Sequence, residues 1–446
     1  MMAAFGSAIN RRRRYTLLPL PDQCRNAPTA RRVNYEVPLF RSPEEFMARA
    51  RSRTSPRLNR EASRLAALSQ SLNRSGSRVE DRYWEAQLGE TIARMLRQGQ
   101  DGPLESALDH LAQHDMGAYE VLIEQAETLS ESMQVEKNGT TYDVLLVVAP
   151  IAAWTRYTIP TGPIPAPAQQ ALLAQLHGHV LAQDARVALL PNLVSIDQMP
   201  RTFAETWQWL HRLAARALGA QTAWPVLNTE VETANMLADT RYLVAAVGVP
   251  QGTPIFRWQE HPEDAAASRD ACLEQWVAQA QPTLAALLPG CGLECLLPDA
   301  YYVSNRDADR RVRPLSLRAA VTWLEGAVNL PPAQLRAVVA GCGESRIDEY
   351  RIGFTARTSN DVYYGCVWPL YGREDDAPTD EGEPDAVDEI AALLKEFGVG
   401  EVRRIPGMLP PEYCEDCGAP HFPNPLGELV HAELPEDAEA SPSHFH

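Results

Sequence analysis

The chain has 446 residues, of which 45% are hydrophobic and 22% are charged, and its formal net charge at pH 7 is −17. This length exceeds what one hydrophobic core usually serves, so the composition indicates a globular protein with several domains. The acidic charge argues against nucleic-acid binding, which needs a basic face, and no run of about 18 apolar residues predicts a membrane span.

Charge is distributed unevenly along the sequence. Residues 1–46 are rich in arginine and proline and predict a disordered basic leader, whereas the chain is strongly acidic from Glu374 onward. The mild apolar stretch at the start lies before Arg11–Arg14, which is the reverse of a secretory signal. Eight cysteines are too few for a disulfide scaffold in a chain of this length, so the expected location is a reducing cytoplasm.

Residues 47–132 are predicted to form a helical block. Apolar residues recur at helical spacing in four segments, which are marked by Leu58, Trp84, Leu104 and Tyr119. Each segment presents one apolar stripe, so the helices should pack on one another or against the next domain. Such a block is typical of a structural cap or a docking surface.

A near-continuous aliphatic run, Tyr142–Pro150, predicts a buried strand. Before it, Asn138-Gly139 separates two strand-like runs and predicts a hairpin with a type I′ turn. A second aliphatic run, Arg241–Pro250, also ends in proline and predicts a matching strand later in the chain.

The segments after these two strands resemble each other in order. Second strands are expected over Trp154–Ile159 and Ile255–Trp258, each followed by a helix and then by a further strand. Those further strands end in Leu189-Leu-Pro-Asn192 and Leu296-Leu-Pro-Asp299, and each precedes a helix that contains Trp-Leu. This repetition indicates copies of one structural unit.

The sequence therefore predicts an α/β fold with mixed (α+β) sheets, in which the helical block precedes pseudo-repeated modules. The modules are expected at 133–222, 223–344 and 345–410, with the plan strand, strand, helix, strand. The third contains an acidic loop, Glu374–Asp385. Short connections between consecutive strands require antiparallel pairs, which argues against a purely parallel sheet.

Residues 411–446 carry the clearest chemical motif, a Cys-x-x-Cys knuckle followed by histidines. A pair of thiolates at this spacing supplies two ligands of a tetrahedral zinc ion, and histidines complete such sites. The predicted ligands are Cys414, Cys417, His431 and either His421 or a residue from elsewhere in the chain. In this proline-rich tail, zinc is expected to be structural.

Other interpretations of the cysteine pair stay open. A redox pair normally relies on a helix N-terminus, and the prolines at 420, 423 and 425 disfavour a helix here. Two unligated thiols are a third interpretation. Cys291 and Cys295 are conceivable distant ligands, although a helix end and a buried strand are expected at their positions.

The segment Ser304–Pro314 is predicted to be an arginine-rich loop between a strand and a helix that starts near Pro314–Ser316. Arginines at a helix N-terminus favour anions, which makes Arg306, Arg310 and Arg311 candidates for binding an anionic small molecule. The competing interpretation is a solvated loop whose charge is balanced by Asp307 and Asp309.

The sequence resembles a bacterial family of conserved hypothetical proteins, one of the domains of unknown function, over about residues 50–440. The resemblance implies a soluble cytoplasmic protein and supplies no activity, substrate or catalytic residue. It is carried by Ser75–Arg82, Leu237–Tyr242, Val367–Leu370, Cys414–Pro420 and Val430–Glu433.

These observations favour a non-enzymatic protein that binds a protein partner or a small ligand, with zinc as structural support. The sequence lacks a Gly-x-Ser-x-Gly elbow, a phosphate-binding P-loop and a dinucleotide fingerprint. The alternative is an enzyme that acts on an anionic metabolite at the arginine loop. Whether the protein is an enzyme is left open by the sequence.

Overall fold

We describe the fold from a computed structural model, which covers residues 58–227, 237–260, 262–343, 347–370, 385–414 and 418–435. The predicted leader at 1–46 and nearly all of the acidic loop at 374–385 lie outside these residues. Among the described helices, none has the length and apolar character needed to cross a membrane.

The N-terminal block consists of α3 (Arg60–Asn73), α4 (Arg78–Gln98), α5 (Asp101–His114) and α6 (Met116–Glu131). The predicted apolar stripes are buried, including Leu65, Ile92 and Leu122 at 0% exposure. Side-chain caps begin three of these helices, from Asn59, Ser77 and Asp115. The prediction of a helical block is confirmed.

The main sheet is centred on two long strands, β2 (Thr140–Trp154) and β6 (Ala238–Pro250). The chain enters β2 from β1 (Ser132–Lys137) through the predicted hairpin, in which Asn138 and Gly139 have φ values of 52° and 75°. These positive angles suit Asn-Gly, which explains why the turn is readable from sequence.

The strands β2 and β6 pair antiparallel in a symmetric register. Tyr142 lies opposite Pro250, and Pro150 lies opposite Tyr242, so two similar nine-residue segments pair antiparallel along their whole length. The shorter strands β4 (Arg186–Leu189) and β5 (Asn192–Ser195) pair with β6, whereas β7 (Gly292–Cys295) and β8 (Asp299–Ala300) pair with β2. Each chain half therefore adds its short strands to the long strand of the other half.

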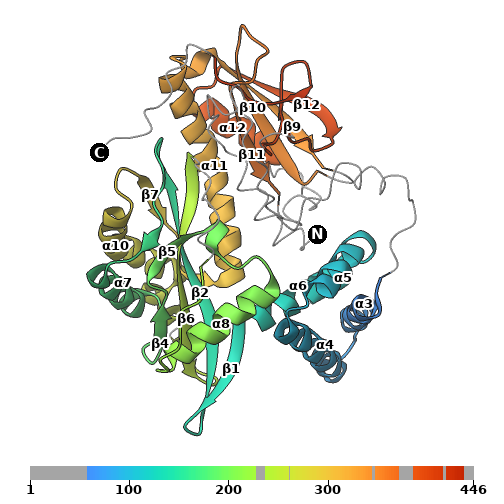
Figure 1. Cartoon of the computed structure of the whole chain (residues 1–446), viewed down its shortest axis with the longest axis vertical. Helices are drawn as coiled ribbons and strands as arrows, with labels where there is room; N and C mark the ends of the chain where they lie inside the picture. Colours follow the sequence, from blue (N-terminus) through green and yellow to red (C-terminus); the bar gives the residue numbers. More distant parts are fainter. Residues whose placement is uncertain are drawn as a thin grey trace, which may run out of the picture.

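Helices cover both faces of the main sheet (Figure 1). On one face, α7 (Ala166–His179) and α10 (Arg269–Leu287) pack on each other and on side chains such as Val147 and Leu243. On the other face lie α8 (Phe203–Ala217), the start of α11 (Tyr301–Ala327) and the helical block. Because successive side chains of a strand point to opposite faces, each strand contributes residues to the core on both faces of the sheet.

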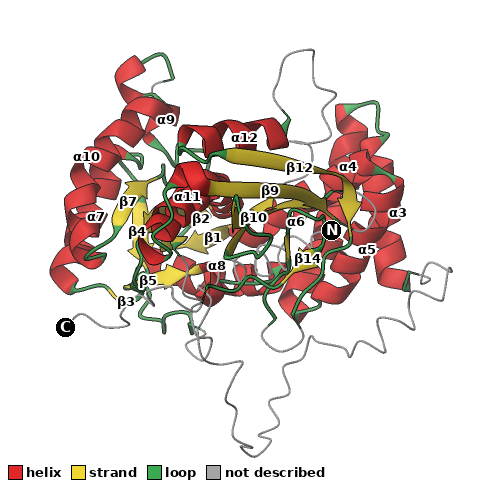
Figure 2. Ribbon diagram, turned by 90° about the horizontal axis from the view of Figure 1, so that it is seen from above, coloured by secondary structure: helices red, strands yellow, loops and turns green. Residues whose placement is uncertain are grey.

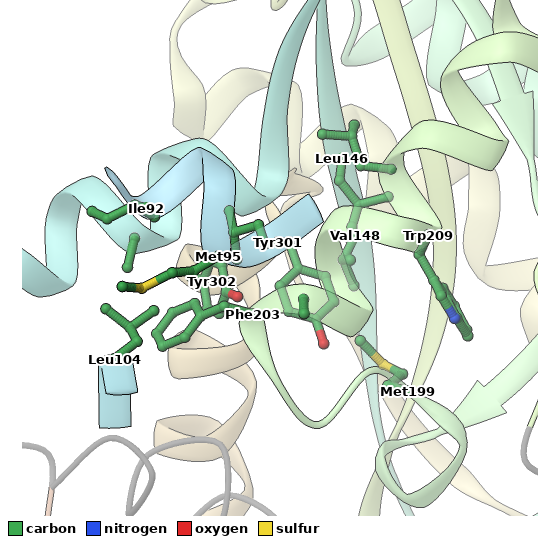
Figure 3. Packing of buried hydrophobic residues seen from close by; sticks show 14 of the residues in the cluster. Ile92, Met95, Leu104, Leu146, Val148, Met199, Phe203, Trp209, Tyr301 and Tyr302 are labelled. Atoms are coloured by element: carbon green, nitrogen blue, oxygen red, sulfur yellow. The ribbon is translucent and has the colours of Figure 1, made fainter. Parts of the chain in front are cut away.

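The helical block and the main sheet share one core. Figure 3 shows Tyr301 and Tyr302 of α11 beside Phe203 of α8, with Met95 of α4 close by. The ring centroids of Phe203 and Tyr302 are 5.9 Å apart. The block is therefore built into the sheet domain, which matches the expectation that its stripes pack against the next domain.

A second sheet has the order β11–β10–β9–β12, with β9 at Leu335–Cys342, β10 at Glu349–Ala356, β11 at Tyr364–Pro369 and β12 at Glu401–Leu409. The β12–β9 pair is parallel and the others are antiparallel, so the predicted α/β class with mixed sheets is confirmed. The C-terminal half of α11 and α12 (Ala386–Glu396) pack on this sheet (Figure 2).

Two predicted strands do not form. The residues after Trp154 leave the sheet, because Arg241 holds the carbonyls of Ile159 and Pro160. The run Ile255–Trp258 enters the short helix α9 (Arg257–Glu260). The first two predicted modules share one sheet, and β9, placed by prediction in the second module, pairs with β10 and β12 of the third.

Candidate metal centre

The C-terminal tail forms a small meander that carries the predicted metal ligands. Its last two strands are β13 (Phe422–Pro423) and β14 (Leu429–Val430), which pair antiparallel. Asn424 closes the turn between them, because its side-chain oxygen accepts hydrogen bonds from the amides of Leu426 (2.9 Å) and Glu428 (3.0 Å). This turn fixes the register of the two strands.

Cys414, the first cysteine of the Cys-x-x-Cys motif, lies just before this hairpin in the chain. Tyr413 forms a bridge with Pro420, the amide of Cys414 donates to the carbonyl of Ala419 (2.8 Å), and the amide of Gly418 donates to the carbonyl of Cys414 (2.8 Å). Gly418 has φ of +70°, the left-handed conformation that favours glycine. These hydrogen bonds hold Gly418 and Ala419 beside Cys414; Cys417 itself lies outside the described residues.

The two histidines lie opposite each other. Phe422 pairs with Val430 at the end of the ladder, and His421 and His431 are the residues next to this pair, just outside the two strands. Their ring centroids are 6.3 Å apart at 83°. Because cross-strand neighbours and alternate residues of a strand share a face, this register places Cys414 on the same face as both histidines.

Each histidine ring has a carboxylate beside Nδ1. His421 Nδ1 lies 3.6 Å from Glu412 Oε2, and His431 Nδ1 lies 3.9 Å from Glu433 Oε1. Histidines that bind metals commonly direct one ring nitrogen toward a carboxylate or carbonyl and use the other for the metal. At these distances neither contact is a hydrogen bond, so the carboxylates do not select which ring nitrogen would face a metal.

The opposite face of the tail packs on the second sheet over two glycines. Gly353 and Gly365 lie opposite each other in β10 and β11. A Cβ atom on Gly365 would overlap the ring of Phe422, and one on Gly353 would overlap the carbonyl of Pro423. The glycines therefore provide the space in which the tail lies.

Arg351 of β10 joins this sheet to the tail and is 0% exposed. Its Nε donates to Glu349 Oε1 (2.8 Å), and Nη1 donates to the carbonyls of Glu412 (2.6 Å) and His421 (2.9 Å). The guanidinium also lies 4.9 Å from the centroid of the Tyr413 ring. Nothing in the local sequence around Arg351 points to the tail, so these contacts are not predictable from sequence.

The described residues contain no group of three or more His, Cys, Asp or Glu side chains already arranged around a metal position. Cys414, His421 and His431 are among the described residues and are not gathered into such a group, whereas Cys417 lies outside them. Cys295 lies in β7 of the main sheet, where burial, followed by the charge of Glu294, raises the thiol pKa to about 12.

The predicted arginine loop was wrong. Ser304–Pro314 is part of the continuous helix α11, with Pro314 inside it. Each candidate arginine has a carboxylate neighbour: Arg306 contacts Glu127 at 2.7 Å, Arg310 contacts Asp307 at 3.1 Å, and Arg311 contacts both oxygens of Glu294 at 2.7 and 2.6 Å. The positive helix terminus on which the anion site depended is absent at these positions. Binding of an anion by these residues stays a prediction.

A model of the family described as "Protein of unknown function (DUF2863)" matches residues 50–445. The chain belongs to this family. The matched residues include the helical block, both sheets and the tail, so the family model covers all of these parts. No curated protein and no solved structure matches the chain.

Proposed function

We propose that this protein is a non-enzymatic, cytoplasmic partner- or ligand-binding protein whose C-terminal tail holds one structural zinc ion. The proposed ligands are Cys414, Cys417, His421 and His431. The observation that carries the zinc proposal is the position of His421 opposite His431, on the face that also bears Cys414. Two thiolates and two imidazoles form a donor set that tetrahedral zinc commonly takes.

The energetic argument is that the tail has little core of its own. Its buried apolar contribution centres on Phe422, which packs with Val367 of β11 and with Val362, two residues before that strand. Structural zinc sites in small domains contribute about 10–16 kcal/mol of apparent binding energy, which is available for folding the ligand-bearing segment. Zinc would therefore fix the two turns of the meander relative to each other.

Metal analysis of the full chain, purified without a histidine tag, tests the zinc part. We expect about one equivalent of zinc, and loss of that zinc in a Cys414→Ser/Cys417→Ser variant. His110→Ala/His114→Ala is a matched control, because these stacked histidines of α5 lie outside the tail. Less than about half an equivalent, together with two freely titratable tail thiols, would contradict the proposal.

The binding part is tested separately by affinity capture from the native cytosol, with mass spectrometry of retained proteins and metabolites. We expect the full chain to retain one species reproducibly. Retention of none, in the presence of zinc, would argue against a binding role. Turnover of a retained metabolite would instead favour the enzyme alternative.

The symmetric register of β2 and β6 also supports an internal repeat. If the segments Tyr142–Pro150 and Tyr242–Pro250 descend from one ancestral strand, a twofold axis between them relates α7 to α10 and α8 to α11. A superposition of the β2–α8 and β6–α11 backbones that fails would exclude this relation.

A further inference from the structure

The outer side of α4 carries two large apolar side chains that are exposed to solvent. Val79 and Tyr83 are 79% and 58% exposed and lie one helical turn apart. They point away from the stripe that packs into the core, which includes Leu88 and Ile92. Figures 1 and 2 show α4 at the periphery of the molecule. Where an amphipathic helix faces water, polar residues are expected, so this apolar pair is a candidate contact surface.

Neighbouring contacts restrain this apolar pair. The rings of Tyr83 and Trp84 lie 4.9 Å apart in an edge-to-face arrangement. Trp84 Nε1 donates to Glu80 Oε1 at 3.2 Å, so the tryptophan ring is itself tethered within the helix. A side chain that is already restrained loses less conformational entropy when a partner covers it, which favours binding at this position.

The same outer face carries charges of both signs, placed symmetrically about Ala86. Arg82 lies four residues before Ala86 and Glu90 lies four residues after it, and all three are exposed. If two α4 helices pair antiparallel about a twofold axis beside Ala86, Arg82 of each copy lies opposite Glu90 of the other. A parallel pair would instead place like charges together, which costs affinity. The charges of this face are therefore complementary to the same face of a second, antiparallel copy.

We propose that α4 forms the interface of a symmetric homodimer, in which the outer faces of two α4 helices pack antiparallel and cover Val79 and Tyr83. Two symmetry-related pairs of Arg82 and Glu90 set the register, and Val79 lies opposite Ala93, since they are seven residues before and after Ala86. The inference goes beyond the proposed function and does not depend on zinc. One pair of helices makes a small interface, so the expected dissociation constant is on the order of micromolar.

Sedimentation velocity of the full chain over a range of concentrations tests the proposal. We expect the wild type to convert from monomer to dimer as its concentration rises. Arg82→Glu places two like-charged pairs in the interface and should weaken the dimer at least about tenfold. The charge swap Arg82→Glu/Glu90→Arg rebuilds both pairs in reverse and should return the dissociation constant to within about threefold of the wild type.

Two further variants separate this interface from general effects of charge and folding. Arg318→Glu is the matched control, because it makes the same charge change at an exposed position of α11 outside the helical block. It should dimerise as the wild type does. Tyr83→Ser removes the exposed ring without changing charge, so it should weaken the dimer while the circular dichroism of the monomer stays that of the wild type.

The possible results support or overturn the proposal as follows. A wild type that stays monomeric throughout the micromolar range would overturn it, and protection of Tyr83 from nitration in that monomer would show that a segment of the same chain covers α4. A dimer that Arg82→Glu leaves intact, or one that the charge swap fails to restore, would also overturn it. If either charge variant does not fold, Tyr83→Ser decides, and a dimer of wild-type affinity in that variant would contradict the proposal.

Discussion

Arg241 of β6 and Arg351 of β10 form the same local arrangement in two different sheets. Each is buried, and each pairs with an acid two residues earlier, Asp239 at 2.5 Å and Glu349 at 2.8 Å. Arg241 donates to the carbonyls of two consecutive loop residues, whereas Arg351 donates to two separate strands. The first arrangement holds one loop on a sheet, whereas the second holds two strands of the tail on a sheet.

The strongest expected effect comes from removing the acid of the main-sheet pair. Asp239→Ala would leave the guanidinium of Arg241 buried without its carboxylate, and breaking such a pair typically costs about 3–5 kcal/mol of unfolding free energy. Chemical denaturation measures the loss. Asp239→Asn keeps an acceptor oxygen and should lose less. Equal stability of Asp239→Ala and wild type would show that this pair is not what holds the 155–160 loop.

On the tail side, Gly365→Ala is the sharpest change that leaves the proposed metal ligands and Arg351 untouched. The added methyl group overlaps the ring of Phe422, and overpacking of this kind costs about 1–3 kcal/mol. We expect faster proteolysis of the tail with the main sheet unaffected. Gly326→Ala in α11 is the control, because its Cβ meets nothing within 4 Å. Equal protection of the tail in both variants would contradict the packing described here.

Glu131 is a buried acid whose main contact is a backbone amide instead of a guanidinium, and its pKa differs accordingly. Its carboxylate accepts from the amide of Tyr302 at 2.9 Å, and burial raises its pKa from 4.5 to about 8. The folded protein then retains a proton that the unfolded chain releases. The stabilising contribution is complete below pH 4.5 and is lost as the pH rises through 8.

Glu131→Gln should make the free energy of unfolding depend less on pH in this range. Wild-type unfolding free energy should fall between pH 5 and 8 by at most about 1.4 kcal/mol per pH unit more steeply than that of the variant. Denaturation at several pH values gives both slopes. Glutamine keeps an oxygen acceptor for the amide of Tyr302, which isolates the titration. Identical slopes would mean that Glu131 ionises normally in the folded protein.

The smallest effect is expected for an exposed pair. Arg311 and Glu294 form two hydrogen bonds, but their side chains are 45% and 39% exposed. Surface pairs contribute about 0–1 kcal/mol, so Arg311→Ala should change the unfolding free energy by no more than that. The same variant tests the predicted anion site. If phosphate raises the melting temperature of the wild type but not of Arg311→Ala, the result would support an anion site at Arg311. If phosphate raises both melting temperatures equally, Arg311 does not bind the anion.

Much of the fold was readable where local signals agreed with burial. The stripes at Ile92 and Leu122, the Asn138-Gly139 turn and the strand Tyr142–Pro150 all formed as predicted. In contrast, α11 passes through Pro314 with Asn305, Asp309 and Arg313 on its buried face. A polar run with an internal proline reads as a loop, and only tertiary contacts make it helical.

The site was readable only in part for a related reason. The Cys-x-x-Cys spacing and the nearby histidines are local features, so the sequence alone singles them out. That His421 lies opposite His431 depends on the turn closed by Asn424, and the contacts of Arg351 depend on how the tail crosses β10. Both are products of register and docking, which spacing along the chain does not encode.

X-ray absorption at the zinc edge identifies the atoms that bind zinc in the 446-residue chain. A site built from Cys414, Cys417, His421 and His431 predicts a shell of two sulfur atoms at about 2.3 Å and two nitrogen atoms at about 2.0–2.1 Å. A shell of oxygen and nitrogen without sulfur would contradict a zinc ion held by this tail.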